Sequence, residues 1–175
     1  MNNYEIEFSL YSHPAIRNSF AGVFALDTLP DRVRNRKPCS YVCNLSPIKN
    51  PGTHWVCVFV PITGYVEYFD SFGLEPPKEL KNFMGRNEFK KNIEWIQGPL
   101  TTACGQYCMY YIYSRTVYGL SMNEIISQLK RVIDAGHPVD EYVNTSVERM
   151  FGLDLDAIDM NFLVEQYIRF QNEKR

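Results

Sequence analysis

The sequence predicts an α+β fold, in which a central, mostly antiparallel sheet is flanked by helices. The middle of the chain holds short runs of β-branched and aromatic residues separated by Pro and Gly, which are typical of strands. The last third instead repeats apolar residues at helical spacing. A chain of 175 residues can bury one hydrophobic core, and no repeat or long linker divides it, so we expect a single domain over residues 1–175.

Four segments carry the strand prediction. Residues 41–45 form a short apolar run, and residues 55–60 form a nearly continuous one, as expected for a strand buried on both faces. Residues 65–69 follow after a short loop that contains Gly64, so 55–60 and 65–69 should pair as an antiparallel hairpin. Residues 93–96 predict a further short strand.

The helices are expected mainly in the C-terminal third. Between residue 104 and about residue 117, positions 104, 108, 111, 112 and 115 share one helix face, and only Arg115 is unsuited to burial. Further helices are predicted at about 121–133, 139–151 and 159–171, with breaks at Gly136, Pro138 and Gly152. The first 30 residues are mixed and predict no single element.

The bulk composition excludes several classes of protein. The net charge of −2 and the pI of about 5.9 do not favour nucleic-acid binding, and the basic run at 32–37 is interpreted as a solvated surface. Five cysteines, an odd number in a chain of this size, favour free thiols in a reducing compartment. No apolar stretch reaches the ~18 residues of a membrane span, and the first residues do not resemble a signal peptide, so we expect an intracellular protein without a membrane partner.

The predicted hairpin brings a histidine to an acid. If its turn centres on Ile62, His54 faces Asp70 across the two strands, where opposite Cβ atoms lie ~5 Å apart. A carboxylate beside an imidazole fixes its tautomer and stabilises its charged form, which is the orienting role in a catalytic triad. A register shift of one residue would place the two side chains on opposite faces. An ordinary His–Asp contact at the end of a sheet remains the alternative.

Cys104 is the candidate nucleophile. A loop enters a helix here, with Thr101 or Thr102 as the expected N-cap, so Cys104 lies in the first turn, where the free N–H groups and the helix dipole favour a thiolate. A nearby imidazolium would lower the pKa of the thiol further. Gly105 is expected to leave room for a substrate carbonyl. The other cysteines are interpreted as buried structural thiols: Cys39, Cys43, Cys57 and Cys108.

Gln97 lies seven residues before Cys104. Its side-chain amide could join the backbone N–H of Cys104 in holding a developing oxyanion, although a lone Gln is usually a surface residue. The cysteines lack zinc-ribbon spacing, and the three histidines are not paired in sequence. We therefore expect neither a metal nor a cofactor.

The ordered set His54-Trp55, Asp70, Gln97-Gly98-Pro99 and Ala103-Cys104-Gly105 resembles the adenain family of adenovirus-type maturation proteases. These enzymes belong to the clan of ubiquitin-like-protein proteases, and the sequence looks most like the adenain-like enzymes of virophages and of Polinton/Maverick-type transposons. The matching motifs run from about residue 20 to 118. The resemblance implies a papain-like-clan α+β fold with Cys104 as nucleophile, His54 as base, Asp70 as third triad member and Gln97 as oxyanion donor.

The resemblance also implies that the substrates are capsid or core precursor polypeptides, cleaved in a host-cell viral factory or nucleus or within the virion. Adenovirus enzymes have Glu where this chain has Asp70, and they use DNA and a disulfide-linked peptide as activators. The acidic balance and the lack of any cysteine between Cys57 and Cys104 argue against both activators here. We expect a monomer.

Two other functions fit the same residues. A protease that deconjugates ubiquitin- or SUMO-like proteins would use the same chemistry on a folded partner. A catalytically silent binding module of the same fold is a further alternative, although the four intact residues His54, Asp70, Gln97 and Cys104 argue against it.

Overall fold

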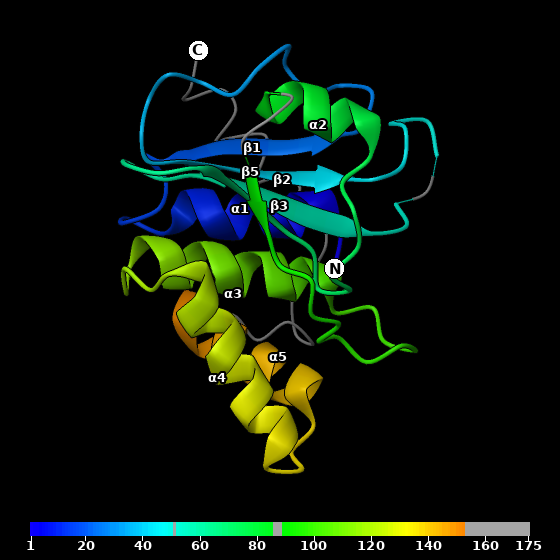
Figure 1. The fold of residues 1–175 in the computed structure, drawn as a ribbon, viewed down its shortest axis with the longest axis vertical. Helices are drawn as coiled ribbons and strands as arrows, with labels where there is room; N and C mark the ends of the chain where they lie inside the picture. Colours follow the sequence, from blue (N-terminus) through cyan, green and yellow to red (C-terminus); the bar gives the residue numbers. More distant parts are fainter. Residues whose placement is uncertain (51, 86–88, 153–175) are drawn as a thin grey trace.

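The computed structural model describes residues 1–50, 52–85 and 89–152, in which a five-stranded sheet is covered by helices on both faces (Figure 1). The elements follow in the order α1 (Asn3–Ser12), β1 (Phe20–Ala25), β2 (Cys39–Asn44), β3 (Trp55–Val60), β4 (Val66–Phe69), α2 (Lys78–Met84), β5 (Phe89–Lys91), α3 (Cys104–Thr116), α4 (Met122–Asp134) and α5 (Val139–Phe151). The α+β class with flanking helices is confirmed. None of the helices in these ranges is long and apolar enough to cross a membrane.

The strands lie side by side in the order β1-β2-β3-β4-β5. The centre of the sheet is antiparallel as predicted, because β3 pairs in opposite directions to β2 and β4. The two outer pairings, β1 with β2 and β4 with β5, are parallel. The long connections 26–38 and 70–88 allow this, since parallel neighbours need a crossover rather than a tight turn.

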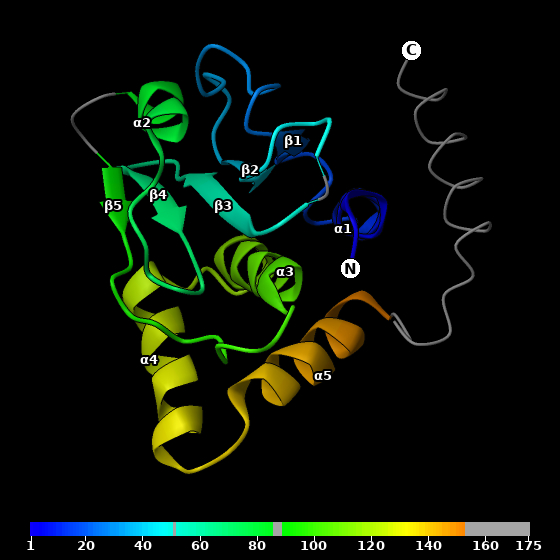
Figure 2. The same cartoon turned by 90° about the vertical axis from the view of Figure 1, so that its right-hand side faces the viewer.

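The continuous apolar run of β3 is explained by burial on both faces of the sheet. Val56, Val58 and Val60 pack with α2, whereas Cys57 and Phe59 pack with α3 and the helices beyond it. Successive side chains of a strand point to opposite faces, so a strand between two apolar layers has no polar position. Figure 2 shows α2 on one side of the sheet, and α3 with α4 and α5 on the other.

Helices α3, α4 and α5 begin and end within about one residue of the predicted bounds, and strand β3 has the predicted bounds. The predicted strand at 93–96 is wrong: these residues run without strand pairing, and β5 lies a few residues earlier. The predicted helix at 159–171 lies outside the described residues. Helix α1 was not predicted, although Asn2 and Glu5 form a capping box at its start, a signal that the sequence contains.

The hairpin of β3 and β4 turns through residues 61–65, at the end of the sheet away from His54 and Asp70. Ile62 and Tyr65 are exposed in this turn. Gly64 adopts a φ of 94°, which other residues rarely adopt. The turn therefore contributes little to the core.

A buried ion pair ties α3 to the sheet. Arg115 binds both carboxylate oxygens of Glu67 on β4, at 2.8 and 3.1 Å, and its guanidinium lies over the Phe59 ring. The Tyr111 hydroxyl donates to the same carboxylate at 2.7 Å. This explains how the one charged residue on the predicted buried face of α3 is accommodated.

Changing Arg115 to Ala should lower the free energy of unfolding by about 3–5 kcal/mol, because it leaves the buried Glu67 carboxylate without its cation. Urea denaturation measures the change. The matched control is Lys81→Ala, which removes an exposed partner of Glu75 and should cost no more than about 1 kcal/mol. Equal losses in the two variants would contradict a structural role for the Arg115–Glu67 pair.

Candidate active site

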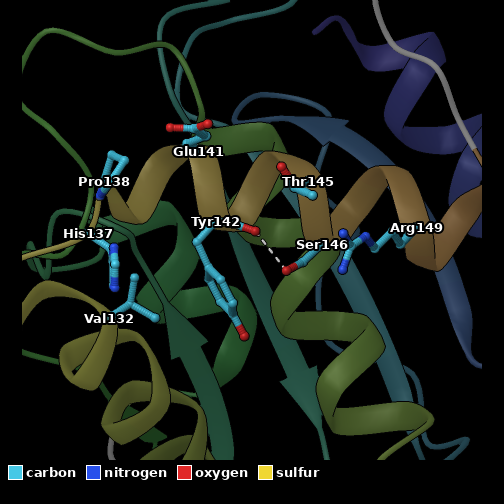
Figure 3. A pocket seen from close by; sticks show the side chains of 8 residues that line it. All are labelled: Val132, His137, Pro138, Glu141, Tyr142, Thr145, Ser146 and Arg149. Atoms are coloured by element: carbon cyan, nitrogen blue, oxygen red, sulfur yellow. Dashed lines mark hydrogen bonds between the residues drawn. The ribbon is translucent and has the colours of Figure 1, made fainter. Parts of the chain in front are cut away.

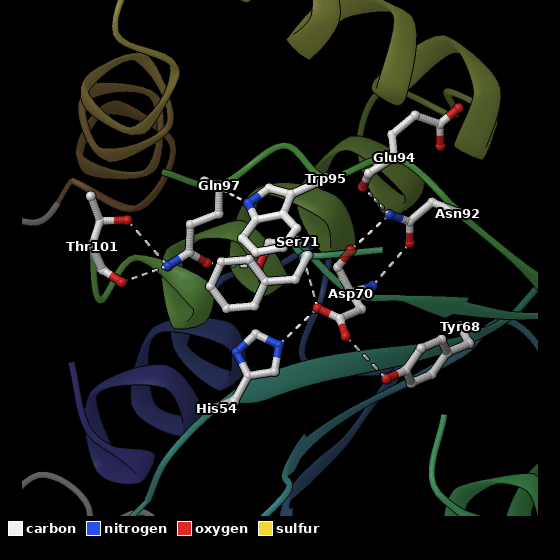
Figure 4. Close-up of polar contacts among 10 residues, drawn as sticks. His54, Tyr68, Asp70, Ser71, Asn92, Glu94, Trp95, Gln97 and Thr101 are labelled. Carbon is white, nitrogen blue, oxygen red and sulfur yellow. Dashed lines mark hydrogen bonds and ion pairs between the residues drawn. The ribbon is translucent and has the colours of Figure 1, made fainter. Parts of the chain in front are cut away.

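His54 and Asp70 meet at one end of the β3–β4 hairpin (Figure 4). His54 directly precedes β3 and Asp70 directly follows β4, and His54 Nε2 lies 2.7 Å from Asp70 Oδ1. The strand register differs from the prediction, because Cys57 pairs with Phe69, and continuing this pairing places Val56 rather than His54 opposite Asp70. The difference is two residues, so both side chains stay on the predicted common face.

Asp70 is fully buried. Its Oδ1 accepts hydrogen bonds from His54 Nε2 and from the Phe72 backbone N–H at 2.8 Å, and its Oδ2 lies 3.5 Å from the Tyr68 hydroxyl. A carboxylate removed from water in this way is stabilised by a neighbouring positive charge. Protonated His54 provides that charge.

Opposing effects act on the pKa of His54. Burial lowers it, but the hydrogen bond to Asp70 and the neighbouring Asp70 and Cys104 groups raise it more, to about 9. Nε2 is committed to Asp70, which leaves Nδ1 as the nitrogen for the thiol. Nδ1 is buried without a partner in full hydrogen-bond geometry, an arrangement typical of catalytic pairs before substrate binds.

Cys104 is the first residue of α3, as predicted, and its side chain is buried. Burial raises the pKa of the thiol, but the neighbouring His54 imidazole and the backbone groups of Trp55 and Gly105 lower it below the usual value. The pKa of the Cys104 thiol is thus lowered while the pKa of the His54 imidazole is raised. The geometry therefore favours a thiolate–imidazolium pair.

Two details at the start of α3 differ from the predictions. The N-cap is Ala103, without a side-chain hydrogen bond, because Thr101 belongs to the preceding turn and its hydroxyl donates to Gly98. A Cβ on Gly105 would lie 3.0 Å from atoms of both Ile6 and Met1. The small residue therefore allows α1 to pack against α3, instead of leaving room for a substrate carbonyl.

Gln97 is buried rather than a surface residue. Its Oε1 accepts from the Ser71 hydroxyl at 2.7 Å, and its Nε2 donates to the Thr101 carbonyl at 2.8 Å and to the Thr101 hydroxyl at 3.2 Å. Both ends of the amide are therefore engaged within the protein (Figure 4). The contact with the hydroxyl is the longest and weakest of the three.

The segments that carry Asp70 and Gln97 are bound to each other. The Ser71 carbonyl accepts from the N–H groups of Ile96 and Gln97, at 2.9 and 3.1 Å. Gly73 has a φ of 66°, and a Cβ there would lie 2.7 Å from the backbone of residues 93 and 94. A glycine is required at this close approach.

Aromatic rings extend from His54 to the surface. Phe72 stacks on the imidazole with centroids 4.9 Å apart, and Trp95 packs against Phe72 at 5.2 Å. The Trp95 indole N–H donates to the Gln97 carbonyl at 2.7 Å. Other large apolar side chains on the same two segments are exposed: Leu74, Ile93 and Leu100.

Asp140, at the start of α5, fixes the turn after Gln97. Its carboxylate accepts from the Gly98 N–H, at 3.1 and 3.3 Å, and from the Tyr107 hydroxyl at 2.8 Å. A Cβ on Gly98 would lie 2.6 Å from that carboxylate, so a larger residue here would have to displace the Asp140 side chain. Helix α5 thus holds the loop that leads to Cys104.

Three of these contributors were missed from the sequence: Ser71, Phe72 and Asp140. Each acts through contacts between segments distant in the chain, and no local pattern marks them. The nearest available signal is that Ser71 and Phe72 directly follow a candidate catalytic residue.

The remaining cysteines are buried and free, as predicted. Burial raises the pKa of Cys43 to about 12 and holds the pKa of Cys108 well above its usual value. Across the described ranges, no group of three or more His, Cys, Asp or Glu side chains is arranged to hold a metal ion. A surface hollow beside α5, lined by His137, Tyr142 and Arg149 among others, includes none of the four predicted site residues (Figure 3).

Comparison with known proteins adds one relative. No protein-family model matches the chain. A cysteine protease of African swine fever virus is 30% identical over 99 residues, which cover 46% of this chain and 36% of that protein. The match thus spans little more than a third of the relative's length.

The crystal structure of the African swine fever virus protease has a similar fold. It superposes with a TM-score of 0.53 and 23% identity, over 72% of this chain and 60% of that one. The narrower resemblance to adenain-like enzymes of virophages and Polinton/Maverick elements stays a prediction. Over the matched region, the chain is homologous to the cysteine protease of African swine fever virus, and it shares the papain-like α+β fold of that enzyme.

Proposed function

We propose that the chain is a cysteine endopeptidase in which Cys104 is the nucleophile, His54 the general base and acid, and Asp70 the residue that orients His54. The observation that supports the proposal is that His54 is bonded to a buried carboxylate and shares a mutual pKa shift with the Cys104 thiol. Asp70 binds Nε2 at 2.7 Å, and Cys104 interacts with the same ring. Homology to a viral cysteine protease supports the same chemistry.

The arrangement supports a two-step reaction. The Cys104 thiolate attacks the scissile carbonyl carbon, and the imidazolium gives its Nδ1 proton to the leaving amine as the C–N bond breaks. Water then loses a proton to Nδ1 and attacks the thioester, which releases the acid and restores the thiolate–imidazolium pair. Asp70 keeps Nε2 protonated throughout, so that Nδ1 always faces the reacting atoms.

Two donors are proposed for the oxyanion. The backbone N–H of Cys104 lies in the first turn of α3, where N–H groups have no partner within the helix. The second donor is Gln97 Nε2. Of its two contacts with Thr101, the 3.2 Å bond to the hydroxyl is the weaker, so this N–H is the one that can turn to the substrate.

The substrate is proposed to be an extended polypeptide, namely a capsid or core precursor of a virus or virus-like element. Exposed apolar side chains on the two segments around His54 offer a surface for such a chain: Leu74, Ile93, Trp95 and Leu100. The relative is itself a viral protease. We propose that the enzyme acts as a monomer within the host cell or the virion, without activation by DNA or by a disulfide-linked peptide.

Changing Cys104 to Ala should lower cleavage of a co-expressed capsid precursor by about 10⁵-fold or more, because no other thiol can replace the nucleophile. Gel analysis of the precursor measures this. Cys39→Ala, which removes a buried thiol from β2, should retain activity. Retained cleavage by the Cys104 variant would remove this residue from the mechanism, and efficient cleavage of only ubiquitin-like fusions would replace the proposed substrate class.

The pH dependence of kcat/KM should follow the pKa values of His54 and Cys104. The pKa of His54 is raised to about 9, so kcat/KM should hold near neutral pH and fall as the imidazolium loses its proton above about pH 9. On the acid side it should fall at a pH below the usual thiol pKa, because the pKa of Cys104 is lowered. Asp70→Asn should reduce kcat by about 100- to 10,000-fold and move the alkaline limb to lower pH. An unchanged alkaline limb in that variant would contradict the role of Asp70 in raising the pKa of His54.

Changing Gln97 to Ala should reduce kcat by about 100- to 1,000-fold with little change in KM, because an oxyanion donor acts in the transition state. The control is Thr101→Val, which removes the hydroxyl that Nε2 contacts in the free enzyme but keeps the carbonyl contact. Steady-state kinetics on a peptide substrate compare them. If both variants lose kcat equally, Gln97 acts by holding the loop rather than by binding the oxyanion.

A further inference from the structure

Asn92 occupies the point where the backbone pairing of β4 and β5 ends. The last pair of this parallel ladder is Tyr68 with Lys91, and the chain then leaves the sheet along residues 92–96. Asp70 lies just beyond the ladder, so its backbone N–H and C=O have no strand neighbour to bind. The C=O accepts a hydrogen bond from the Gly73 N–H at 2.9 Å, whereas the N–H depends on a side chain. Unpaired backbone groups at a buried position are costly.

The Asn92 side chain binds both of these groups (Figure 4). Its Oδ1 accepts from the Asp70 N–H at 3.0 Å, and its Nδ2 donates to the Asp70 carbonyl at 2.7 Å and to the Glu94 carbonyl at 3.2 Å. Asn92 is only 3% exposed. The amide thus continues the strand pairing for one residue, with a side chain in place of backbone.

The geometry requires an amide. One group must accept a hydrogen bond while its neighbour donates one, and among neutral side chains only Asn and Gln offer a carbonyl and an NH₂ on the same planar group. Ala would leave the buried N–H of Asp70 unpaired and would remove one of the two donors to the Asp70 carbonyl, the other being the Gly73 N–H. A carboxylate could accept but not donate, and it would bring a second negative charge beside Asp70.

We propose that Asn92 is a positioning residue of the active site, which fixes the backbone of Asp70 so that its carboxylate stays on His54 Nε2. The catalytic consequence rests on the proposed function, whereas the effect on the His54–Asp70 pair does not. A purely structural role would lower stability and leave the pair unchanged in the molecules that remain folded.

The test is the titration of His54 by NMR in Asn92→Ala, below the temperature at which the variant unfolds. The chain has only three histidines, at 13, 54 and 137, so the ring signals can be assigned by substitution. The pKa of His54, about 9 in the parent chain, should fall by about one pH unit or more, because a displaced carboxylate stabilises the imidazolium less. The titration of His13 should not change.

Arg115→Ala is the matched control, because it removes a buried polar contact at the far end of α3 and does not touch Asp70. It should lower stability without moving the His54 titration. If Asn92→Ala does not fold, Asn92→Ser carries the test, since a hydroxyl can still serve the Asp70 backbone in part. A His54 titration equal to that of the parent chain, in either folded variant, would overturn the proposal.

Kinetics add a second measurement. In an active parent enzyme, Asn92→Ala should reduce kcat about 10- to 100-fold with KM within about twofold. The Asn92–Asp70 contact acts on the His54–Asp70 pair and not on bound substrate. A rise in KM alone would overturn the positioning role. If the parent chain cleaves no peptide, the proposed function fails, and the NMR titration still decides the role of Asn92.

Discussion

The hydrogen bond between His54 and Asp70 is the contact on which the rest of the site depends. Asp70 is wholly removed from water, and a buried carboxylate is stable only where cations and N–H donors replace the lost solvent. The imidazole supplies one donor at 2.7 Å, and the Phe72 backbone supplies another. The same bond draws positive charge onto His54, and that charge in turn favours the thiolate of Cys104.

Two loops and helix α5 hold this contact in place. The Ser71 carbonyl and hydroxyl bind the segment of Gln97, and Asp140 binds Gly98 from α5. The parts of the site come from positions 54, 70, 97 and 104, which are dispersed along the chain. Their separations are fixed because each loop is bound by hydrogen bonds to a neighbour rather than left to solvent. Such preorganisation avoids the cost of ordering the groups during the reaction.

The sequence predicted those features that depend on local pattern. The apolar run of β3, the helical spacing of α3 and the first-turn position of Cys104 all follow from residue type and periodicity. The His54–Asp70 contact was predicted correctly although the predicted strand register was two residues off. An even shift keeps both side chains on the same face of the sheet. Features decided by distant contacts escaped prediction. Thr101 does not cap α3 because its hydroxyl is used by Gly98, and residues 93–96 do not form a strand because side chains and loop backbone take their hydrogen bonds.

The turn at residues 61–65 has a consequence for how such a chain can change over time. It lies at the opposite end of the hairpin from His54 and Asp70, and its exposed residues contribute little to the core. An insertion or deletion in this turn leaves the His54–Asp70 contact intact as long as the pairing of β3 with β4 is kept. A one-residue slip of that pairing would instead separate His54 from Asp70. Related chains can therefore differ in length at this point while the chemistry at the other end is conserved.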